Sequence, residues 1–205
     1  MSFMTEVSSL TGRLLVATPA LADPNFDRAV VLLLDHDEEG SLGVVLNRPT
    51  PVDVADILEG WGDLAGAPGV VFQGGPVSLD SALGVAVIPG EEGSAPSSPR
   101  SRPRPVRGEP IGWRRVHGAI GLVDLDTPPE LLAPALGSLR IFAGYAGWGP
   151  GQLEDELAEG AWYVVESEPG DVSSPSPERL WRAVLRRQRS ELAMVATYPD
   201  DASLN

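Results

Sequence analysis

The chain has 205 residues, 42% of them hydrophobic, so it can bury a core without help from a disulfide or a metal. Its 29 acidic and 15 basic residues give a formal net charge of −14, and a field of that sign repels nucleic-acid phosphates and anionic lipids. The sequence contains no cysteine and no lysine, which excludes thiolate nucleophiles, iron–sulfur clusters and Schiff-base chemistry. We expect a single domain over residues 1–205, with no cofactor and no nucleic-acid partner.

The first ten residues are polar and mixed, without the basic and then apolar stretches of a secretory signal peptide. No stretch approaches the ~20 apolar residues that a membrane-spanning helix needs. These two features predict a cytoplasmic protein that has no membrane partner.

In the first half of the chain, short apolar runs alternate with turn signals. Residues 14–17 predict a strand, and residues 29–34 and 42–46 predict a hairpin that turns at 37–40. Thr50 followed by Pro51 is a typical helix start, so we expect a helix that ends near Glu59. Residues 70–73 and 82–88 predict two further strands.

The second half begins with residues 90–110, a segment rich in Pro, Ser and Arg that we expect to be a mobile surface insertion. Its arginines could contact an anion or RNA, but no aromatic residue is interleaved for base stacking, which favours a solvated linker. Beyond it we expect strands at 116–123, 139–143 and 161–166, a glycine-rich loop at 144–149, and helices at 127–136, 150–158 and 177–189. This interleaving predicts a mixed sheet in an α/β domain.

Polar and glycine-rich segments follow three of the predicted strands, the position at which α/β sheets gather ligand-binding groups. Amide side chains both donate and accept hydrogen bonds, a guanidinium binds carboxylate or phosphate, and glycine lets a backbone approach closely. The alternative is that these segments are tight turns that satisfy their own backbone. If these three segments, at 46–49, 73–76 and 144–152, converge, they form a site for a small anionic ligand, with the candidates Asn47, Arg48, Gly74, Gly75, Tyr145, Trp148, Gln152 and Glu156. Asn25 and Arg28, from the spaced pattern described below, complete the candidate set.

The Gln152–Glu156 pair and His36 could each take part in chemistry. Gln152 and Glu156 are four residues apart on one flank of a predicted helix and could bind a ligand or a hard cation, although acidic residues near a helix start also simply stabilise its dipole. His36 lies between two aspartates and could be a general base, but we expect a half-buried histidine bonded to a neighbouring carboxylate. Two histidines far apart in the sequence make no case for a metal site.

Six blocks of residues then form one spaced pattern: GRLLVA at 12–17, DPNF at 23–26, LNRP at 46–49, GGPV at 74–77, GYAGW at 144–148 and GQLE at 151–154. The pattern resembles the AlgH/YqgE family of bacterial proteins over nearly the whole chain. The resemblance implies a mixed α/β fold with a bent sheet like a partial barrel, flanked by helices. It implies no activity, because the family's function is not established. Some members are labelled transcriptional regulators, yet this chain shows no helix-turn-helix signal.

Three functions remain open at this stage. The first is a regulatory or small-ligand-binding protein without catalysis, which the lack of a nucleophile–base pair favours. The second is an enzyme, for example a hydrolase, that acts on an anionic small molecule through Asn47, Arg48, Gln152 and Glu156. The third is DNA-binding regulation, against which the net charge argues. We rank them in that order.

Overall fold

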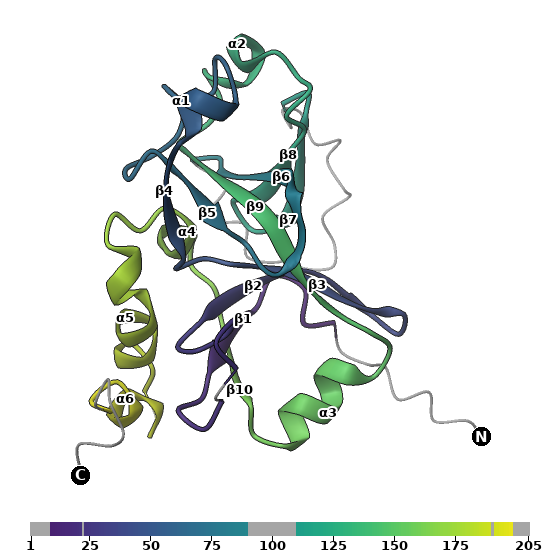
Figure 1. Cartoon of the computed structure of the whole chain (residues 1–205), viewed down its shortest axis with the longest axis vertical. Coiled ribbons are helices and arrows are strands. Elements are labelled where there is room, and N and C mark those ends of the chain that lie inside the picture. The colour runs from purple at the N-terminus through teal and green to yellow at the C-terminus, as the bar shows by residue number, and fades with distance from the viewer. Residues whose placement is uncertain (1–8, 22, 90–109, 190, 199–205) are drawn as a thin grey trace, which may run out of the picture.

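A curled sheet, mainly antiparallel, forms the framework of the chain (Figure 1). The computed structural model describes residues 9–21, 23–89, 110–189 and 191–198. The strands are β1 (Leu14–Ala17), β2 (Val30–Asp37), β3 (Gly40–Val45), β4 (Pro49–Asp53), β5 (Val70–Gln73), β6 (Val77–Val87), β7 (Trp113–His117), β8 (Ile120–Val123), β9 (Ser138–Trp148) and β10 (Trp162–Val165). Their order is β10–β1–β2–β3–β9–β6–β8–β7, while β5 lies parallel to β9 and antiparallel to β4. The mixed α/β fold with a bent sheet is confirmed.

The long strand β9 joins the two ends of this sheet. Its first residues pair with β6, and its last residues pair with β3, from Gly43 opposite Ala146 to Ser41 opposite Trp148. The loop expected at 144–149 is therefore wrong for residues 144–148, which continue the strand. Gly144 adopts a φ of +72° at the point where the pairing with β6 shifts register. Glycine tolerates that conformation, so β9 bends here without ending.

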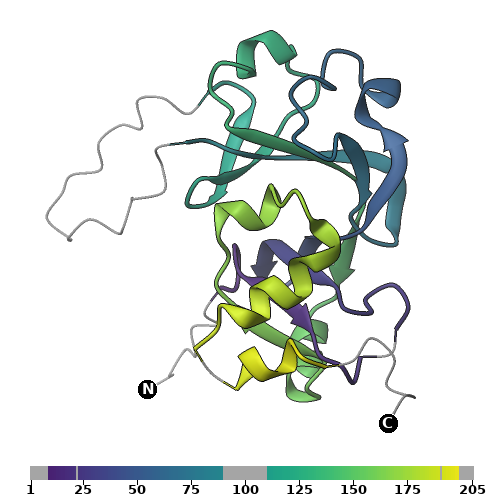
Figure 2. The ribbon, with the colours of Figure 1, turned by 90° about the vertical axis from the view of Figure 1, so that its left-hand side faces the viewer.

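Helices cover both faces of the lower part of the sheet (Figures 1 and 2). The helices of the described residues are α1 (Val54–Ile57) and α2 (Pro129–Leu132), which lie at the upper end of Figure 1, and α3 (Gln152–Ala158), α4 (Pro169–Val172), α5 (Leu180–Arg186) and α6 (Leu192–Val195). Along β1, Leu14 and Val16 belong to the core cluster of Trp181 on α5, whereas Leu15 and Ala17 belong to that of Leu153 on α3. Because alternate residues of a strand point to opposite faces, α3 and α5 lie on opposite sides of the sheet.

Several predicted elements are confirmed, and others need correction. The strand at 14–17, the β2–β3 hairpin and the strand at 70–73 form as expected. The helix expected from Thr50 is wrong: residues 49–53 form β4, where the Thr50 hydroxyl donates to the Val71 carbonyl at 2.6 Å, and α1 begins only at Val54. The strand expected at 116–123 is a hairpin that turns at Gly118, and the helix at 127–136 shortens to α2. Tertiary pairing outweighs a weak local helix preference in these segments.

Two other expectations concern the insertion and the membrane. The insertion at 90–110 lies outside the described residues, apart from Pro110. Within the described ranges, no helix has both the length and the apolar character needed to cross a bilayer.

Candidate ligand-binding site

Two of the three expected segments, 46–49 and 73–76, meet where β3 and β5 end, together with the loop between β1 and β2. The backbone ties them together: the Val45 amide donates to the Gly74 carbonyl at 2.8 Å, and the Gln73 amide donates to the Arg48 carbonyl at 2.8 Å. The junction encloses a small cavity of about 80 Å³. It is lined by Pro24, Asn25, Val45, Arg48, Gln73, Gly75 and Pro76. Of the expected site residues, Asn25, Arg48 and Gly75 line this hollow.

A second cavity, of about 260 Å³, lies on the α5 side of Arg48. Its walls are Asp27, Arg28, Asn47, Arg48, Glu178, Trp181 and Arg182. Three guanidinium groups thus face two carboxylates, an excess of positive charge in a chain whose formal net charge is −14. We call the two cavities together the strand-end site.

Arg48 lines both cavities of the strand-end site. Its Nη2 donates to the backbone carbonyl of Asp27. Within the described part of the chain, no carboxylate lies within ion-pair distance of its guanidinium, although Asp27 lines the same cavity. A backbone carbonyl cannot neutralise the cation, so Arg48 keeps donors and a full charge for an anion.

Asn47 positions the loop that carries Arg28. The Asn47 side chain is buried; its Oδ1 accepts from the Val30 amide at 3.0 Å and its Nδ2 donates to the Arg28 carbonyl at 2.9 Å. Arg28 itself has a φ of +53°, a left-handed conformation that is uncommon for a residue other than glycine. Asn47 therefore acts by holding the strained backbone of Arg28, and each polar atom of its side chain makes one hydrogen bond in doing so.

Trp181 and Arg182 were not predicted as site residues. The Trp181 ring is buried, donates from Nε1 to the Ala17 carbonyl at 2.9 Å, and lies under the Arg28 guanidinium, whose Cζ is 4.7 Å from the ring centroid. Arg182 donates to the carbonyls of Ala196 and Tyr198. The sequence places Trp181 on the apolar face of a helix, but no local signal indicates which loop that helix covers.

An ion pair fixes α5 beside this site. Arg187, just after α5, contacts both carboxylate oxygens of Asp171 on α4, at 2.5 and 2.7 Å. The hydrogen bonds that Arg187 donates to the buried Asp171 carboxylate raise the pKa of Arg187 above its ordinary value. This two-point contact holds the helix that supplies Trp181 and Arg182.

The glycines after β5 serve close packing of the backbone. A Cβ at Gly75 would lie 2.2 Å from the backbone of Tyr145, and one at Gly74 would lie 2.4 Å from the Gly144 carbonyl. The Gly74 amide already donates to Ala143 at 2.8 Å. Of the two, only Gly75 lines the smaller cavity. Tyr145 is half-buried beside the α5-side core.

The remaining candidates lie on the other face of the sheet, beneath α3. Gln152 accepts from the Gly149 amide at 3.0 Å and donates to Glu156 at 3.2 Å, while Glu156 also accepts from the Trp162 indole at 3.2 Å. Trp148, Trp162 and Phe26 pack together: the ring centroids are 6.3 Å apart for Phe26 and Trp148, 5.5 Å for Phe26 and Trp162, and 6.2 Å for the two tryptophans. Trp148, Gln152 and Glu156 are absent from the linings of both strand-end cavities. The expected convergence therefore splits into two groups.

Sequence and fold comparisons agree on the relatives of this chain. The AlgH-like family pattern matches residues 14–193. The chain belongs to the AlgH-like family. It is 86% identical to a UPF0301 protein of Streptomyces avermitilis over all of both chains, and 47% identical to one of Thermobifida fusca over 96% of each.

Two solved AlgH-like folds match the structure. Protein DIP2367 of Corynebacterium diphtheriae superimposes with a TM-score of 0.78 and 31% identity, covering 92% of each chain. The AlgH protein of Pseudomonas aeruginosa gives a TM-score of 0.63 and 26% identity, covering 98% of this chain and 100% of its own.

His36 of this AlgH-like chain differs from its expectation. It is fully buried, and its partners are not the adjacent aspartates: Nδ1 lies 2.6 Å from the Ser41 hydroxyl, and Nε2 lies 3.3 Å from Glu154 on α3. The reason is the hairpin register, which sets Ser41 directly opposite His36. A serine–histidine–carboxylate chain thus exists that the sequence analysis missed, although the predicted hairpin contained the signal.

The surroundings of that chain do not favour hydrolysis. The adjoining cavity, of about 260 Å³, is lined by Asp35, Asp37 and Glu39 together with Gly40, Ser41, Leu42 and Trp148. Three carboxylates would destabilise the oxyanion that forms when a serine attacks a carbonyl. The geometry instead suits a structural role, in which buried His36 links β2 and β3 to α3. Among the described residues, no three His, Asp or Glu side chains gather as metal ligands.

Arg140 on β9 is also held by backbone carbonyls, as Arg48 and Arg182 are, but it lies deep inside the chain. It is 2% exposed, lies over the Phe72 ring at 4.4 Å, and donates to the carbonyls of Ala67 and Ser174 at 3.1 and 2.8 Å. Its Nε and Nη1 have no hydrogen-bond partner among the described residues. Burial lowers the pKa of Arg140 to about 10, so the side chain is still a cation at neutral pH.

Proposed function

We propose that this AlgH-like chain is a cytoplasmic binding protein for a small anionic ligand, which it holds at the strand-end site. The observation that carries the proposal is the Arg48 guanidinium, which lines two adjoining cavities and is held by a backbone carbonyl instead of a carboxylate. Arg28 and Arg182 line the larger cavity with it. A preformed hollow with convergent cationic donors is the usual form of an anion site.

The dimensions and the packing narrow the class of ligand. A hollow of about 80 Å³ has room for one carboxylate or phosphate group, and about 260 Å³ leaves room for only a small body beside it. The face of Trp181 is already covered by Arg28, which argues against a ligand that stacks an aromatic ring there. These features favour a compact aliphatic anion, such as a phosphate ester or a dicarboxylate.

Binding without catalysis is the simpler proposal. The enzyme considered above would combine Arg48 with Glu156, but Glu156 is on the α3 side of the sheet and is engaged by Gln152 and Trp162. Both residues cannot contact one small molecule across a packed sheet. No observation in the strand-end site supplies a nucleophile with a base beside it.

The proposal is tested by titrating the full chain with inorganic phosphate and with succinate, followed by calorimetry and by NMR of the Trp181 indole. We expect saturable binding of at least one anion, with shifts at Trp181 and Arg48. Arg48→Ala should weaken binding at least tenfold, because one charge-assisted contact is worth about 1.5–3 kcal/mol. Arg48→Lys should restore part of it.

Arg186→Ala is the matched control, since Arg186 is an exposed arginine of α5 that lines neither cavity. It should bind like the unaltered chain. Equal weakening by Arg48→Ala and Arg186→Ala would mean non-specific attraction to positive charge and would contradict the proposal. So would the absence of any shift at Trp181 with either anion.

A further inference from the structure

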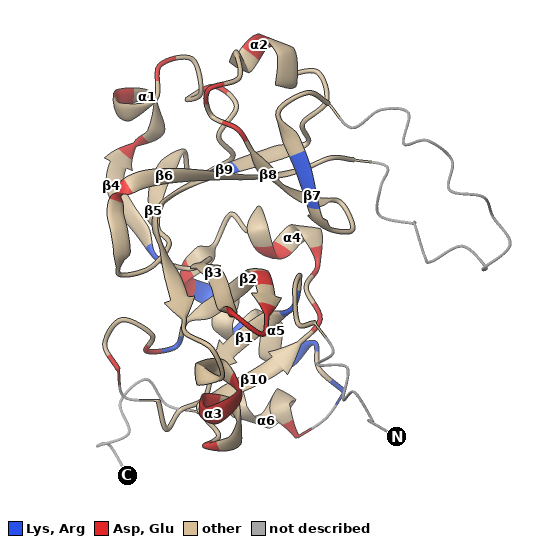
Figure 3. Ribbon diagram, turned by 90° about the vertical axis from the view of Figure 1, so that its right-hand side faces the viewer, with Lys and Arg blue, Asp and Glu red and all other residues tan. Residues whose placement is uncertain are grey.

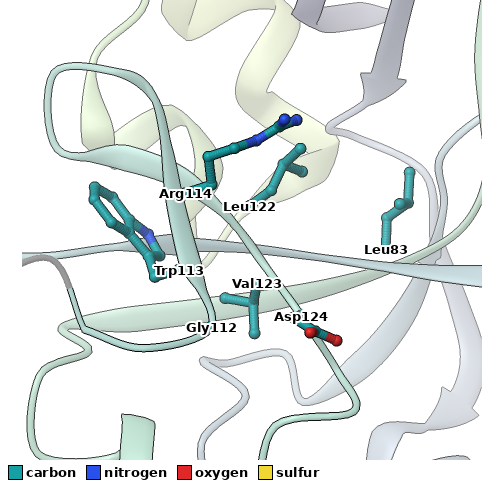
Figure 4. A pocket seen from close by; sticks show the side chains of 7 residues that line it. All are labelled: Leu83, Gly112, Trp113, Arg114, Leu122, Val123 and Asp124. Carbon is teal, nitrogen blue, oxygen red and sulfur yellow. The ribbon is translucent and has the colours of Figure 1, made fainter.

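A groove of about 400 Å³ lies far from the strand-end site, on the part of the sheet formed by β6, β7 and β8 (Figure 4). It is lined by Leu83, Gly112, Trp113, Arg114, Leu122, Val123 and Asp124. None of these residues lines either cavity of the strand-end site. The groove is therefore a separate feature, and it is large enough to hold a small organic molecule.

The strand register places an apolar strip and a cation on one face of this groove. Arg114 pairs with Leu122, and Leu122 pairs with Val85, two residues after Leu83 on β6. Because alternate residues share a face, the side chains of Arg114, Leu122 and Leu83 point the same way. Figure 4 shows these three side chains on one side of the ribbon, with Asp124 on the other.

The charges of the groove are not paired with each other. Within the described residues, Arg114 makes no ion pair, and it is exposed. Asp124 accepts a hydrogen bond from the Asp126 amide at 3.0 Å and so stabilises the turn in which it lies. Leu83 and Leu122 remain only partly buried beside the larger core cluster. The groove thus presents apolar area next to one positive charge.

We propose that this groove binds a small organic carboxylate with an aliphatic body. The body lies along Leu83 and Leu122, and the carboxylate pairs with the Arg114 guanidinium. A guanidinium binds a carboxylate through two parallel hydrogen bonds, which fixes the orientation of the ligand. The aliphatic part gains from leaving water, so a longer body binds more tightly until the groove is filled.

The chemistry separates this ligand from that of the strand-end site. The strand-end cavities carry charged and amide side chains beside a few apolar ones and suit a compact anion. In this groove, a ligand gains affinity from a longer apolar body. The two proposals stand on different residues. Each can fail without affecting the other.

The experiment is a titration of the full chain with butyrate, hexanoate and octanoate, observed through the methyl signals of Leu83 and Leu122. We expect saturable shifts at both leucines, and affinity that rises by up to about fourfold for each added methylene. Octanol, which has the same body without the charge, should bind at least tenfold more weakly than octanoate. Arg114→Gln should remove that difference.

Arg186→Gln is the control, because Arg186 is an exposed arginine of α5 that lines none of the three cavities. It should leave octanoate affinity within twofold, as should Arg48→Ala at the strand-end site. Equal affinity for octanol and octanoate, or an unchanged octanoate affinity in Arg114→Gln, would overturn the assignment to a carboxylate. If the leucine signals do not move with octanoate, the groove is not a binding site.

Discussion

Polar side chains on the two faces of the lower sheet differ in how completely other side chains satisfy them. Beneath α3, Gln152, Glu156 and the Trp162 indole satisfy one another. At the strand-end site on the other side, Arg48 donates to a backbone carbonyl, makes no ion pair with any described residue, and lines two cavities. Figure 3 shows how strongly acidic residues gather on α3, whose own sequence carries Glu154, Asp155 and Glu156.

This contrast shows how the same kinds of residue can serve structure in one place and binding in another. A polar group whose donors and acceptors are matched by other side chains has little left to offer a ligand. A cation that is hydrogen-bonded but not neutralised still attracts an anion. One loop belongs to both faces: Phe26 enters the aromatic cluster, whereas its neighbours Asn25, Asp27 and Arg28 line the strand-end cavities. The α3 side thus anchors the loop that the site uses.

The largest effect should come from removing the aromatic anchor. Trp148→Ala deletes a nearly buried ring that packs on Phe26 and Trp162, and it should lower the free energy of unfolding by about 3–5 kcal/mol. Chemical denaturation followed by circular dichroism measures the loss. Trp148→Phe should lower the free energy of unfolding by less than half as much as Trp148→Ala. A loss below about 1 kcal/mol in Trp148→Ala would show that the cluster does not anchor the fold.

A smaller effect is expected from the hydrogen-bonded carboxylate under α3. In Glu156→Gln one of the two acceptor oxygens becomes a donor, so one of the bonds from Gln152 and Trp162 is lost. The free energy of unfolding should fall by about 1 kcal/mol, while phosphate or succinate binding stays unchanged. Glu159→Gln, at an exposed position after α3, should change stability by less than about 0.5 kcal/mol. Weakened anion binding in Glu156→Gln alone would bring Glu156 back as a ligand residue.

The smallest effect concerns the arginine that is buried instead of facing a cavity. Arg140→Met replaces a desolvated cation with an apolar chain of similar reach, and the free energy of unfolding should change by less than about 1 kcal/mol. The gain from removing an uncompensated charge offsets the loss of the bonds to Ala67 and Ser174. Thermal unfolding at neutral pH measures this change in the free energy of unfolding. A loss of about 3 kcal/mol or more would indicate that Arg140 has a counter-charge in solution.

The sequence by itself determined the elements whose residues are buried on both faces. The apolar runs of β1, β2 and β3 predict strands because only a covered sheet accommodates them, and the turn between β2 and β3 follows from local residues. It also indicated that the segments of Arg48 and Gly75 would be neighbours, since turns at strand ends tend to meet. The resemblance of its spaced blocks to the AlgH/YqgE family added the bent sheet.

Only the tertiary structure decided which of the ten candidates share a hollow. Whether a strand-end segment such as 144–148 forms a loop or continues β9 depends on partners more than a hundred residues away in β3 and nearer ones in β6. The side of the sheet that α3 and α5 cover is likewise not encoded in either helix alone. Trp181 joined Arg28 and Arg48 because long-range packing, not local pattern, sets which helix lies against which loop.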